Sequence, residues 1–228
     1  MLRRAIRLLA GSCLLAAFLP GCGGEMEPER QSYAGRSEGN LYCPAEMALV
    51  PSGDFTFGPE KPGGKGERMP VRAFCIDRYE YPNRKGDPPL RSATWIEAAN
   101  FCTQRGKRLC TEYEQERACR GPKSLLYPYG NQFAPGACPK ADEDYRSGTY
   151  LGCASAFGVF DMSGGVWEWT SSETQGEAKD ADEKILRGGM DADDPAGSSR
   201  CASRMHAPAK RSAHEIGFRC CRGPDKQF

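Results

Sequence analysis

Short alternating stretches dominate the pattern of apolar and polar residues along this chain. Residues 43–58 alternate around a Pro-Ser-Gly turn, which predicts a strand, a turn and a second short strand. Residues 71–83 return to strand character, and residues 185–189 re-enter the core. Residues 59–69 are rich in Gly, Pro and Lys, and residues 171–184 are acidic, so we expect both to be exposed loops. The pattern predicts many short strands joined by long connections.

Two helices are predicted between these strands. Thr94 with Glu97 forms a capping box, and the apolar residues after it recur at the spacing of one helix face up to Arg105. Thr111 with Glu114 forms a second box, which begins a helix that we expect to run to about residue 119.

Two carboxylates lie one turn apart in the second predicted helix, at Glu112 and Glu116. Such a pair suits acid–base chemistry or a metal ion. On a short and polar helix, however, it is more often a solvated face, and this is our expectation here.

A glycine-rich turn precedes two tryptophans in residues 158–170. Asp161 and residues 163–165 form a turn that needs the backbone freedom of glycine. Trp167 and Trp169 follow, and on an extended segment their side chains point to the same side, with Glu168 turned the other way. The pattern predicts a turn that leads into a core strand.

The amino end has the features of an export signal. Three arginines within the first seven residues precede an apolar run, residues 8–19, that is too short to span a bilayer comfortably. The run ends in Leu-Pro-Gly-Cys22, which resembles a bacterial lipobox; the alternative is a plain secretory signal with an incidental cysteine. We expect a signal peptide over residues 1–21, acylation of Cys22 at a membrane, and a flexible tether over residues 22–42.

Twelve cysteines are the strongest feature of the composition. Cys13 falls in the signal and Cys22 is the expected lipid site, which leaves ten. An even number in an exported chain is typical of a disulfide framework. Zinc is the rival, but there is no C-x-x-C spacing and only two histidines, His206 and His214, which we expect to be exposed. A formal net charge of +1 does not indicate the basic surface that nucleic-acid binding requires.

Blocks spread along the chain resemble the sulfatase-modifying-factor family, whose best-known members are the formylglycine-generating enzymes. Residues 158–170, GVFDMSGGVWEWT, resemble the family's G-x-Y-D-M-x-G-N-V-W-E-W-T, with Gly165 in place of the asparagine. Residues 106–116 resemble G-K-R-L-P-T-E-A-E-W-E, with Cys110 in place of the proline and Gln115 in place of the tryptophan. Further matching blocks follow the same order: residues 74–83, 127–131, 187–190, 200–204 and 217–220.

The resemblance implies a single α+β domain with a formylglycine-generating-enzyme-like (C-type-lectin-like) fold over residues 43–223 and a tail at 224–228. It also implies two structural bridges, Cys102–Cys220 and Cys119–Cys201, which leave Cys110 and Cys221 for each other. We further pair Cys43 with Cys75, the two earliest cysteines, and Cys138 with Cys153, which bracket a polar loop. A redox role for the vicinal Cys220 and Cys221 is the alternative, although adjacent bridges are strained.

The resemblance places catalysis where this chain lacks the residues for it. In the formylglycine-generating enzymes, R-G-G-S is followed by two cysteines that bind copper(I), a metal that selects soft sulfur ligands. The corresponding residues 190–198, MDADDPAGS, contain no cysteine. Related proteins also carry calcium near an asparagine that is Gly165 here, and the nearby acids Asp142, Glu143 and Asp144 fit no standard calcium loop. We expect no copper and leave calcium open.

Our first hypothesis is a lipid-anchored, non-catalytic binding or scaffold module of the bacterial envelope that binds a protein or a glycan. It faces an oxidising compartment, on the periplasmic side of the outer membrane or at the cell surface. The expected ligand surface comprises Asp191, Asp193, Asp194, Arg204 and His206. The alternative is a copper-dependent formylglycine-generating oxidase with an altered centre that acts on a protein cysteine. Fold alone does not decide between these hypotheses.

Overall fold

The computed structural model of this chain describes residues 40–58, 65–140, 144–174 and 182–226. The expected signal peptide, Cys22 and all but the end of the expected tether lie outside the described residues, as do Asp142 and Glu143.

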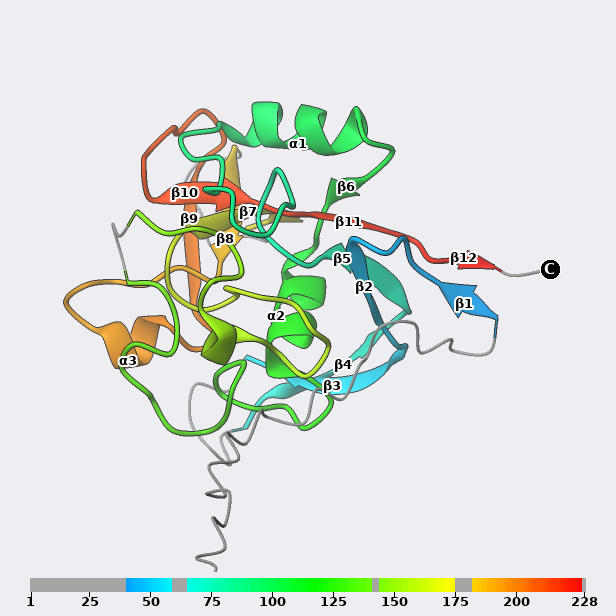
Figure 1. Cartoon of the computed structure of the whole chain (residues 1–228), viewed down its shortest axis with the longest axis horizontal. Helices are drawn as coiled ribbons and strands as arrows, with labels where there is room; N and C mark the ends of the chain where they lie inside the picture. The colour runs from blue at the N-terminus through cyan, green and yellow to red at the C-terminus, as the bar shows by residue number, and fades with distance from the viewer. Residues whose placement is uncertain (1–39, 59–64, 141–143, 175–181, 227–228) are drawn as a thin grey trace, which may run out of the picture. The chain divides into compact units, whose positions relative to one another are not determined.

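Two four-stranded sheets carry most of the regular structure (Figure 1). The first sheet has the order β10-β7-β8-β9, in which only the β10–β7 pair is parallel. Its strands are β7 (Trp167–Glu173), β8 (Glu183–Arg187), β9 (Arg204–Pro208) and β10 (Ile216–Phe218). The second sheet is antiparallel and has the order β2-β5-β11-β6. Its strands are β2 (Met47–Val50), β5 (Phe74–Asp77), β6 (Arg108–Leu109) and β11 (Cys220–Arg222).

Two small two-stranded sheets complete the set among the described residues. One is the hairpin of β3 (Gly53–Phe57) and β4 (Glu67–Val71). The other pairs β1 (Leu41–Tyr42) with β12 (Asp225–Lys226). The β1–β12 pair adds residues on both sides of the expected 43–223 domain to the folded unit.

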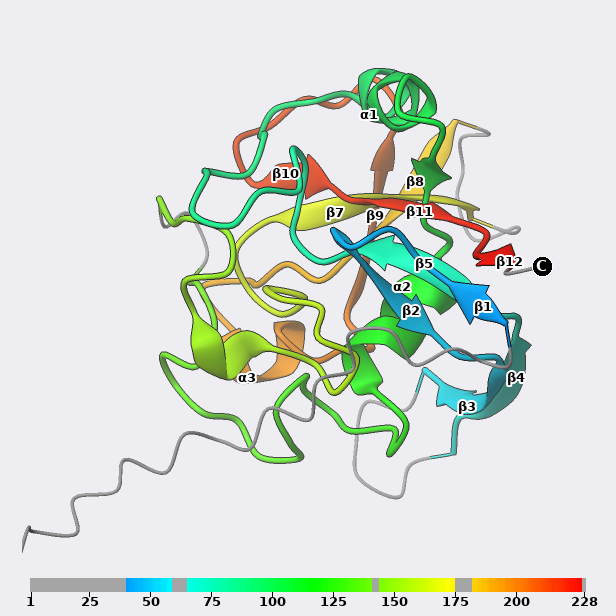
Figure 2. The same cartoon turned by 45° about the vertical axis from the view of Figure 1, so that its right-hand side comes forward.

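The two predicted helices are confirmed, each with the capping box that the sequence indicates. In α1 (Trp95–Thr103) and α2 (Glu112–Arg120), the N-cap threonine and the glutamate three residues later bond reciprocally. Helix α2 packs against β3 and β4 on one side and against β7 and β8 on the other, and it occupies the middle of both views (Figures 1 and 2). Helix α1 packs on β6 and β7. A short helix α3 (Pro195–Ser198) and a 3-10 turn η1 (Leu151–Cys153) lie in the long connections.

The expectation of a solvated face on α2 is wrong. Glu112 and Glu116 are 5% and 1% exposed, because α2 lies between two sheets rather than at the surface. Arg187 on β8 joins them, with Nη2 at 2.7 Å from Glu112 and Nη1 at 2.9 Å from Glu116. Arg120 Nε lies 2.7 Å from the second Glu116 oxygen. Charge pairing therefore compensates the burial of these carboxylates.

The two predicted loops are shorter than expected. Strand β4 takes up residues 67–69 of the first, because β3 pairs with it along its whole length. Residues 171–173 continue β7, and β8 begins at Glu183, so the connection between them covers only part of residues 171–184. Residues 59–64 and 175–181 lie outside the described residues.

The expected core strand after the glycine turn is confirmed. Trp167 and Trp169 belong to one buried cluster with α1 and β10, whereas Glu168 points into a polar cluster on the other side. A second buried cluster joins β2, β5, α2 and the segment 157–162.

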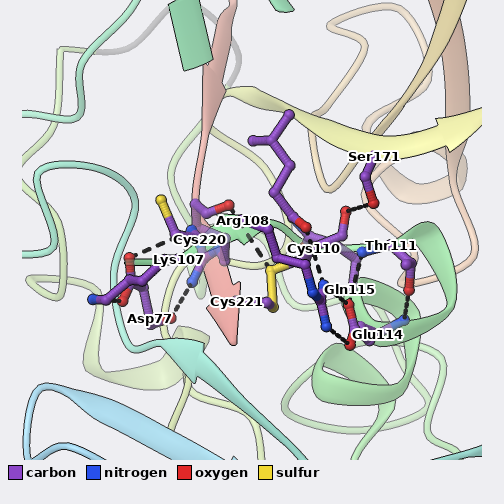
Figure 3. The surroundings of a disulfide bond; sticks show 12 residues. Asp77, Lys107, Arg108, Cys110, Thr111, Glu114, Gln115, Ser171, Cys220 and Cys221 are labelled. Atoms are coloured by element: carbon purple, nitrogen blue, oxygen red, sulfur yellow. Dashed lines mark hydrogen bonds and ion pairs between the residues drawn. A yellow bond between two sulfur atoms is a disulfide. The ribbon is translucent and has the colours of Figure 1, made fainter. Parts of the chain in front are cut away.

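The structure joins the ten cysteines of the domain in the five expected pairs: Cys43–Cys75, Cys102–Cys220, Cys110–Cys221, Cys119–Cys201 and Cys138–Cys153. Vicinal cysteines on β11 thus connect to α1 and to the residue before the α2 cap. Figure 3 shows the second of these bridges, Cys110–Cys221, beside the Arg108–Glu114 ion pair and the Thr111 capping box. These bridges tie both helices to the carboxyl end of the chain, and each adds stability by constraining the unfolded state. The mixed α+β fold with short strands, long loops and many disulfides is the one predicted.

Candidate functional site

An apolar pocket of about 420 Å³ lies beside the segment 190–199. Three parts of the chain meet there: the loop 129–140, the turn 163–164 and the segment that runs from Met190 through α3. Most of the lining side chains are aromatic, aliphatic or proline: Tyr129, Phe133, Ala134, Pro135, Pro139, Met190, Ala192 and Pro195. Its volume lies in the range of ligand sites, and such an apolar lining is typical of them.

Stacked aromatic rings build one wall of the pocket. The rings of Tyr127 and Tyr129 stack with centroids 5.4 Å apart, and Phe133 lies 5.9 Å from Tyr127. The Tyr127 hydroxyl donates to the carbonyl oxygen of Ala196 at 2.7 Å, which ties this wall to α3. The Cys138–Cys153 bridge anchors the far end of the same loop. The wall is therefore fixed in place by covalent and hydrogen bonds.

The floor is the glycine turn that precedes β7. Gly164 and Gly165 have φ angles of 79° and 63°, in the left-handed region. A Cβ at Gly164 would lie 2.1 Å from the carbonyl oxygen of Pro139, so only glycine allows the two segments to approach this closely. The Gly165 N–H donates to the same oxygen at 3.1 Å. The loop and the turn form one continuous surface as a result.

Polar groups in the pocket are largely engaged within the protein. The Ser163 hydroxyl donates to the carbonyl oxygen of Ser199, and the Ser199 hydroxyl donates to that of Pro195. The Ala134 N–H donates to the Tyr129 hydroxyl oxygen at 3.4 Å, and burial raises the pKa of this tyrosine. Lys140 supplies a positive charge to the lining. A ligand would therefore gain most of its affinity from burial of apolar surface.

A buried cluster of acids lies behind the floor. Tyr145 donates to Glu80 at 2.5 Å, and Arg219 forms two bonds to Glu168 at 2.6 and 2.7 Å. The Gly148 N–H donates to Asp161 Oδ2 at 2.6 Å. Burial, reinforced by the Glu80 charge, raises the pKa of Asp161 to about 8. Loss of solvent around the Asp161 carboxyl and the nearby Glu80 charge therefore favour its protonated form.

The expected ligand-surface residues fall into two places. Asp191, Asp193 and Asp194 are exposed on the loop that leads into α3, next to the pocket. Their oxygens engage their own loop: Asp191 Oδ1 accepts from the Asp193 N–H at 2.9 Å, and Asp194 Oδ1 accepts from the Gly197 N–H at 3.0 Å. These aspartates therefore hold the conformation of the loop that carries the pocket residues Ala192 and Pro195.

Arg204 and His206 lie on the edge strand β9 instead. Arg204 Nε lies 3.1 Å from Glu112, so this residue extends the buried charge network of α2. The His206 side chain is 51% exposed, and its Nδ1 lies 2.6 Å from a Glu183 oxygen. The second histidine, His214, is 59% exposed at its side chain.

The state of the cysteine and acidic side chains determines which metal ions this domain could bind. The ten cysteines between 43 and 221 are all in disulfides, so none supplies the free thiolate that copper(I) requires. Within the described ranges, no three His, Cys, Asp or Glu side chains gather in a way that could hold a metal ion. Asp144, from the acidic loop, has a side chain 94% exposed. The helices in the described part of the chain all fall short of the length and hydropathy that a membrane span requires.

The pocket lining was not predicted from the sequence. Its wall comes from the YPYGN turn and the Cys138 loop, and its other side from residues 190–199. Each block is visible in the sequence, but their meeting depends on tertiary contacts such as the Tyr127–Ala196 hydrogen bond.

Comparison with known proteins supports the resemblance. Residues 81–224 match the family model described as "Sulfatase-modifying factor enzyme 1-like domain". An inactive C-alpha-formylglycine-generating enzyme 2 of Bos taurus is 37% identical over 153 residues, which cover 59% of this chain. A formylglycine-generating enzyme of Mus musculus is 32% identical over 186 residues, which cover 67% of this chain. The matched region spans 50% of the length of each relative.

Solved structures show the same fold at low sequence identity. PvdO from Pseudomonas aeruginosa superposes with a TM-score of 0.61 at 20% identity, over 83% of this chain and 100% of its own. CarF gives a TM-score of 0.58 at 18% identity, over 80% and 99%. The family model matches more than half of this chain, and the chain therefore belongs to the family of sulfatase-modifying factor enzyme 1-like domains.

Proposed function

We propose that this chain is a lipid-anchored, non-catalytic binding module of the bacterial envelope, whose ligand enters the apolar pocket beside residues 190–199. The observation that carries the proposal is the character of this pocket. It lies on the segment in which the family resemblance would place the two copper-binding cysteines, and its lining is apolar.

Disulfide bonding supports a binding role over an oxidase role. A copper-dependent oxidase needs two thiolates free at one place. In this structure the cysteine that follows the pocket segment, Cys201, is bonded to Cys119 on α2. The relatives of this chain include one named as a formylglycine-generating enzyme and one named as inactive, so the family alone does not choose between the two roles.

The pocket chemistry favours a partner with an exposed apolar group. Tyr129 and Phe133 offer flat faces against which an aromatic or aliphatic side chain, or the apolar face of a sugar, can pack. We propose a protein or glycan of the envelope as this partner. Anchoring through Cys22 would hold the pocket near the membrane surface, in an oxidising compartment that suits the disulfides.

A pocket-filling variant tests the proposal. Ala192 is exposed and lines the pocket, so Ala192→Trp should fill the opening without disturbing the core. We expect the wild-type protein to enhance the fluorescence of the apolar dye anilinonaphthalene sulfonate, and Ala192→Trp to abolish most of this enhancement.

The matched control is Ala45→Trp, which places the same side chain at an exposed alanine outside the pocket. Equal dye binding by wild type and both variants would contradict a binding role for the pocket. Copper(I)-dependent oxidation of a cysteine peptide by the wild-type protein would instead support the oxidase alternative.

A further inference from the structure

The turn that forms the pocket floor departs from the family at Gly165, the position of an asparagine that relatives use near a calcium ion. Asparagine is among the residues best able to adopt a positive φ, so a backbone angle of 63° does not by itself exclude it. The reason that glycine stands at position 165 must therefore lie in the side chains packed around it.

Tyr145 fills the place of the missing side chain. A Cβ built on Gly165 would lie 2.6 Å from the Tyr145 hydroxyl oxygen, 2.7 Å from Cζ and 2.8 Å from Cε1. These distances are well inside van der Waals contact, and the ring cannot withdraw easily because Tyr145 is 5% exposed. An asparagine at 165 and a tyrosine at 145 therefore exclude each other.

A hydrogen bond to Glu80 also fixes the position of the Tyr145 hydroxyl. The hydroxyl donates to Glu80 Oε1 at 2.5 Å, while Ser147 donates to Glu80 Oε2 at 2.8 Å. Glu80 is fully buried and lies 4.0 Å from Arg219. The ring is thus fixed between the turn and a charged cluster. Among the described residues, no three His, Cys, Asp or Glu side chains gather in a way that could hold a cation.

We propose that the phenol of Tyr145 replaces, in this chain, the asparagine side chain and the calcium ion that the family resemblance implies, so that the pocket floor is held without a metal. The described residues do not fit calcium at this turn, because the Tyr145 ring fills the space that a side chain at position 165 would need. Tyr145 acts as a positioning residue for the floor, whatever ligand the pocket binds.

A double-mutant cycle tests the mutual exclusion, with thermal unfolding of the disulfide-intact protein as the readout. Gly165→Asn alone should lower the Tm by about 5 °C or more, because the new side chain overlaps the Tyr145 ring. In a Tyr145→Ala background, which removes the ring, the same substitution should lower the Tm by less than half as much. An equal loss in both backgrounds would overturn the proposal.

A second measurement needs no variant. The Tm of the wild-type protein should be the same in 5 mM calcium chloride and in EDTA, and Tyr145→Phe should lower the Tm in both buffers alike through loss of the Glu80 hydrogen bond. A higher wild-type Tm in calcium would overturn the claim that the floor is held without a metal. An unchanged Tm for Tyr145→Phe would overturn the positioning role of the hydroxyl.

Discussion

At the scale of single residues, buried charge is the main feature of this protein. Glu80, Glu168 and Asp161 lie within one cluster and are each at most 1% exposed, with Arg219 as the central cation. Burial is the main reason that the pKa values of Glu80 and Asp161 are raised. The carboxyl groups of Glu80 and Asp161 therefore hold their protons more tightly in the folded protein than in the unfolded chain.

This difference in proton affinity makes stability depend on pH. Because the pKa of Asp161 rises from 3.8 to about 8 on folding, its contribution is complete below pH 4 and is lost as pH rises toward 8. Asp161→Asn keeps the shape of the neutral acid. We expect this variant to exceed the wild-type free energy of unfolding at pH 5 and to exceed it by a larger margin at pH 8, as measured by urea titration.

The exposed Asp193 provides the control for this prediction. It lies on the loop before α3, so Asp193→Asn should leave the difference between pH 5 and pH 8 unchanged. A wild-type pH slope that persists in Asp161→Asn would contradict the assignment to Asp161.

At the scale of elements, α2 organises the fold through its acidic face. It meets β8 through Arg187, whose guanidinium joins Glu112 and Glu116, and Arg204 on β9 adds a second contact to Glu112. The side chains of Glu112 and Glu116 are 7% and 0% exposed, so the loss of their partner would leave two buried charges poorly compensated.

Arg187→Met tests this network. We expect a loss of about 3–5 kcal/mol in the free energy of unfolding, the cost typical of breaking a buried ion pair by removing one partner. The matched control is Arg211→Met, which removes an ion pair with Glu215 whose members are 47% and 34% exposed. That variant should change stability by less than about 1 kcal/mol. Similar losses for both would contradict the structural role of the Arg187 network.

The contrast between α1 and α2 shows what the sequence reveals about elements. Capping boxes are local, so Thr94 and Thr111 predicted both helix starts correctly. The environment of a helix is not local. The Glu112–Glu116 spacing is that of a solvated face, and the partner that buries it, Arg187, lies 71 residues beyond Glu116. The lengths of β4 and β7 were underestimated for the same reason, since strand pairing sets them.

At the scale of the whole molecule, the disulfides connect segments distant in sequence. Cys102–Cys220 and Cys110–Cys221 span 118 and 111 residues, and they join the two helices to β11. Cys138–Cys153 spans only 15 and fixes the pocket wall. The cysteine pairs Cys102–Cys220 and Cys119–Cys201 could be predicted because the motifs around them align with those of the family. The pocket itself has no such motif in the sequence, since it forms only where three separate segments meet.

Removal of single bridges should reflect these spans. In the chain-entropy model, a bridge that closes about 100 residues contributes about 4.7 kcal/mol and one that closes about 15 contributes about 3 kcal/mol. We therefore expect the Cys110→Ala/Cys221→Ala variant to lose more stability in guanidinium unfolding than Cys138→Ala/Cys153→Ala. The shorter bridge should matter more for dye binding, because it holds the pocket wall. The reverse order in both measurements would contradict these separate roles.

The central claim is that this domain uses its cysteines for structure and its altered 190–199 segment for binding. A disulfide map of the folded, purified protein tests the claim most directly: alkylation without reduction, digestion, and identification of linked peptides by mass. We predict that Cys119 is joined to Cys201 and that none of the ten domain cysteines is alkylated. Alkylation of Cys201 together with Cys220 or Cys221 would contradict the account, because free thiols there would restore a redox centre.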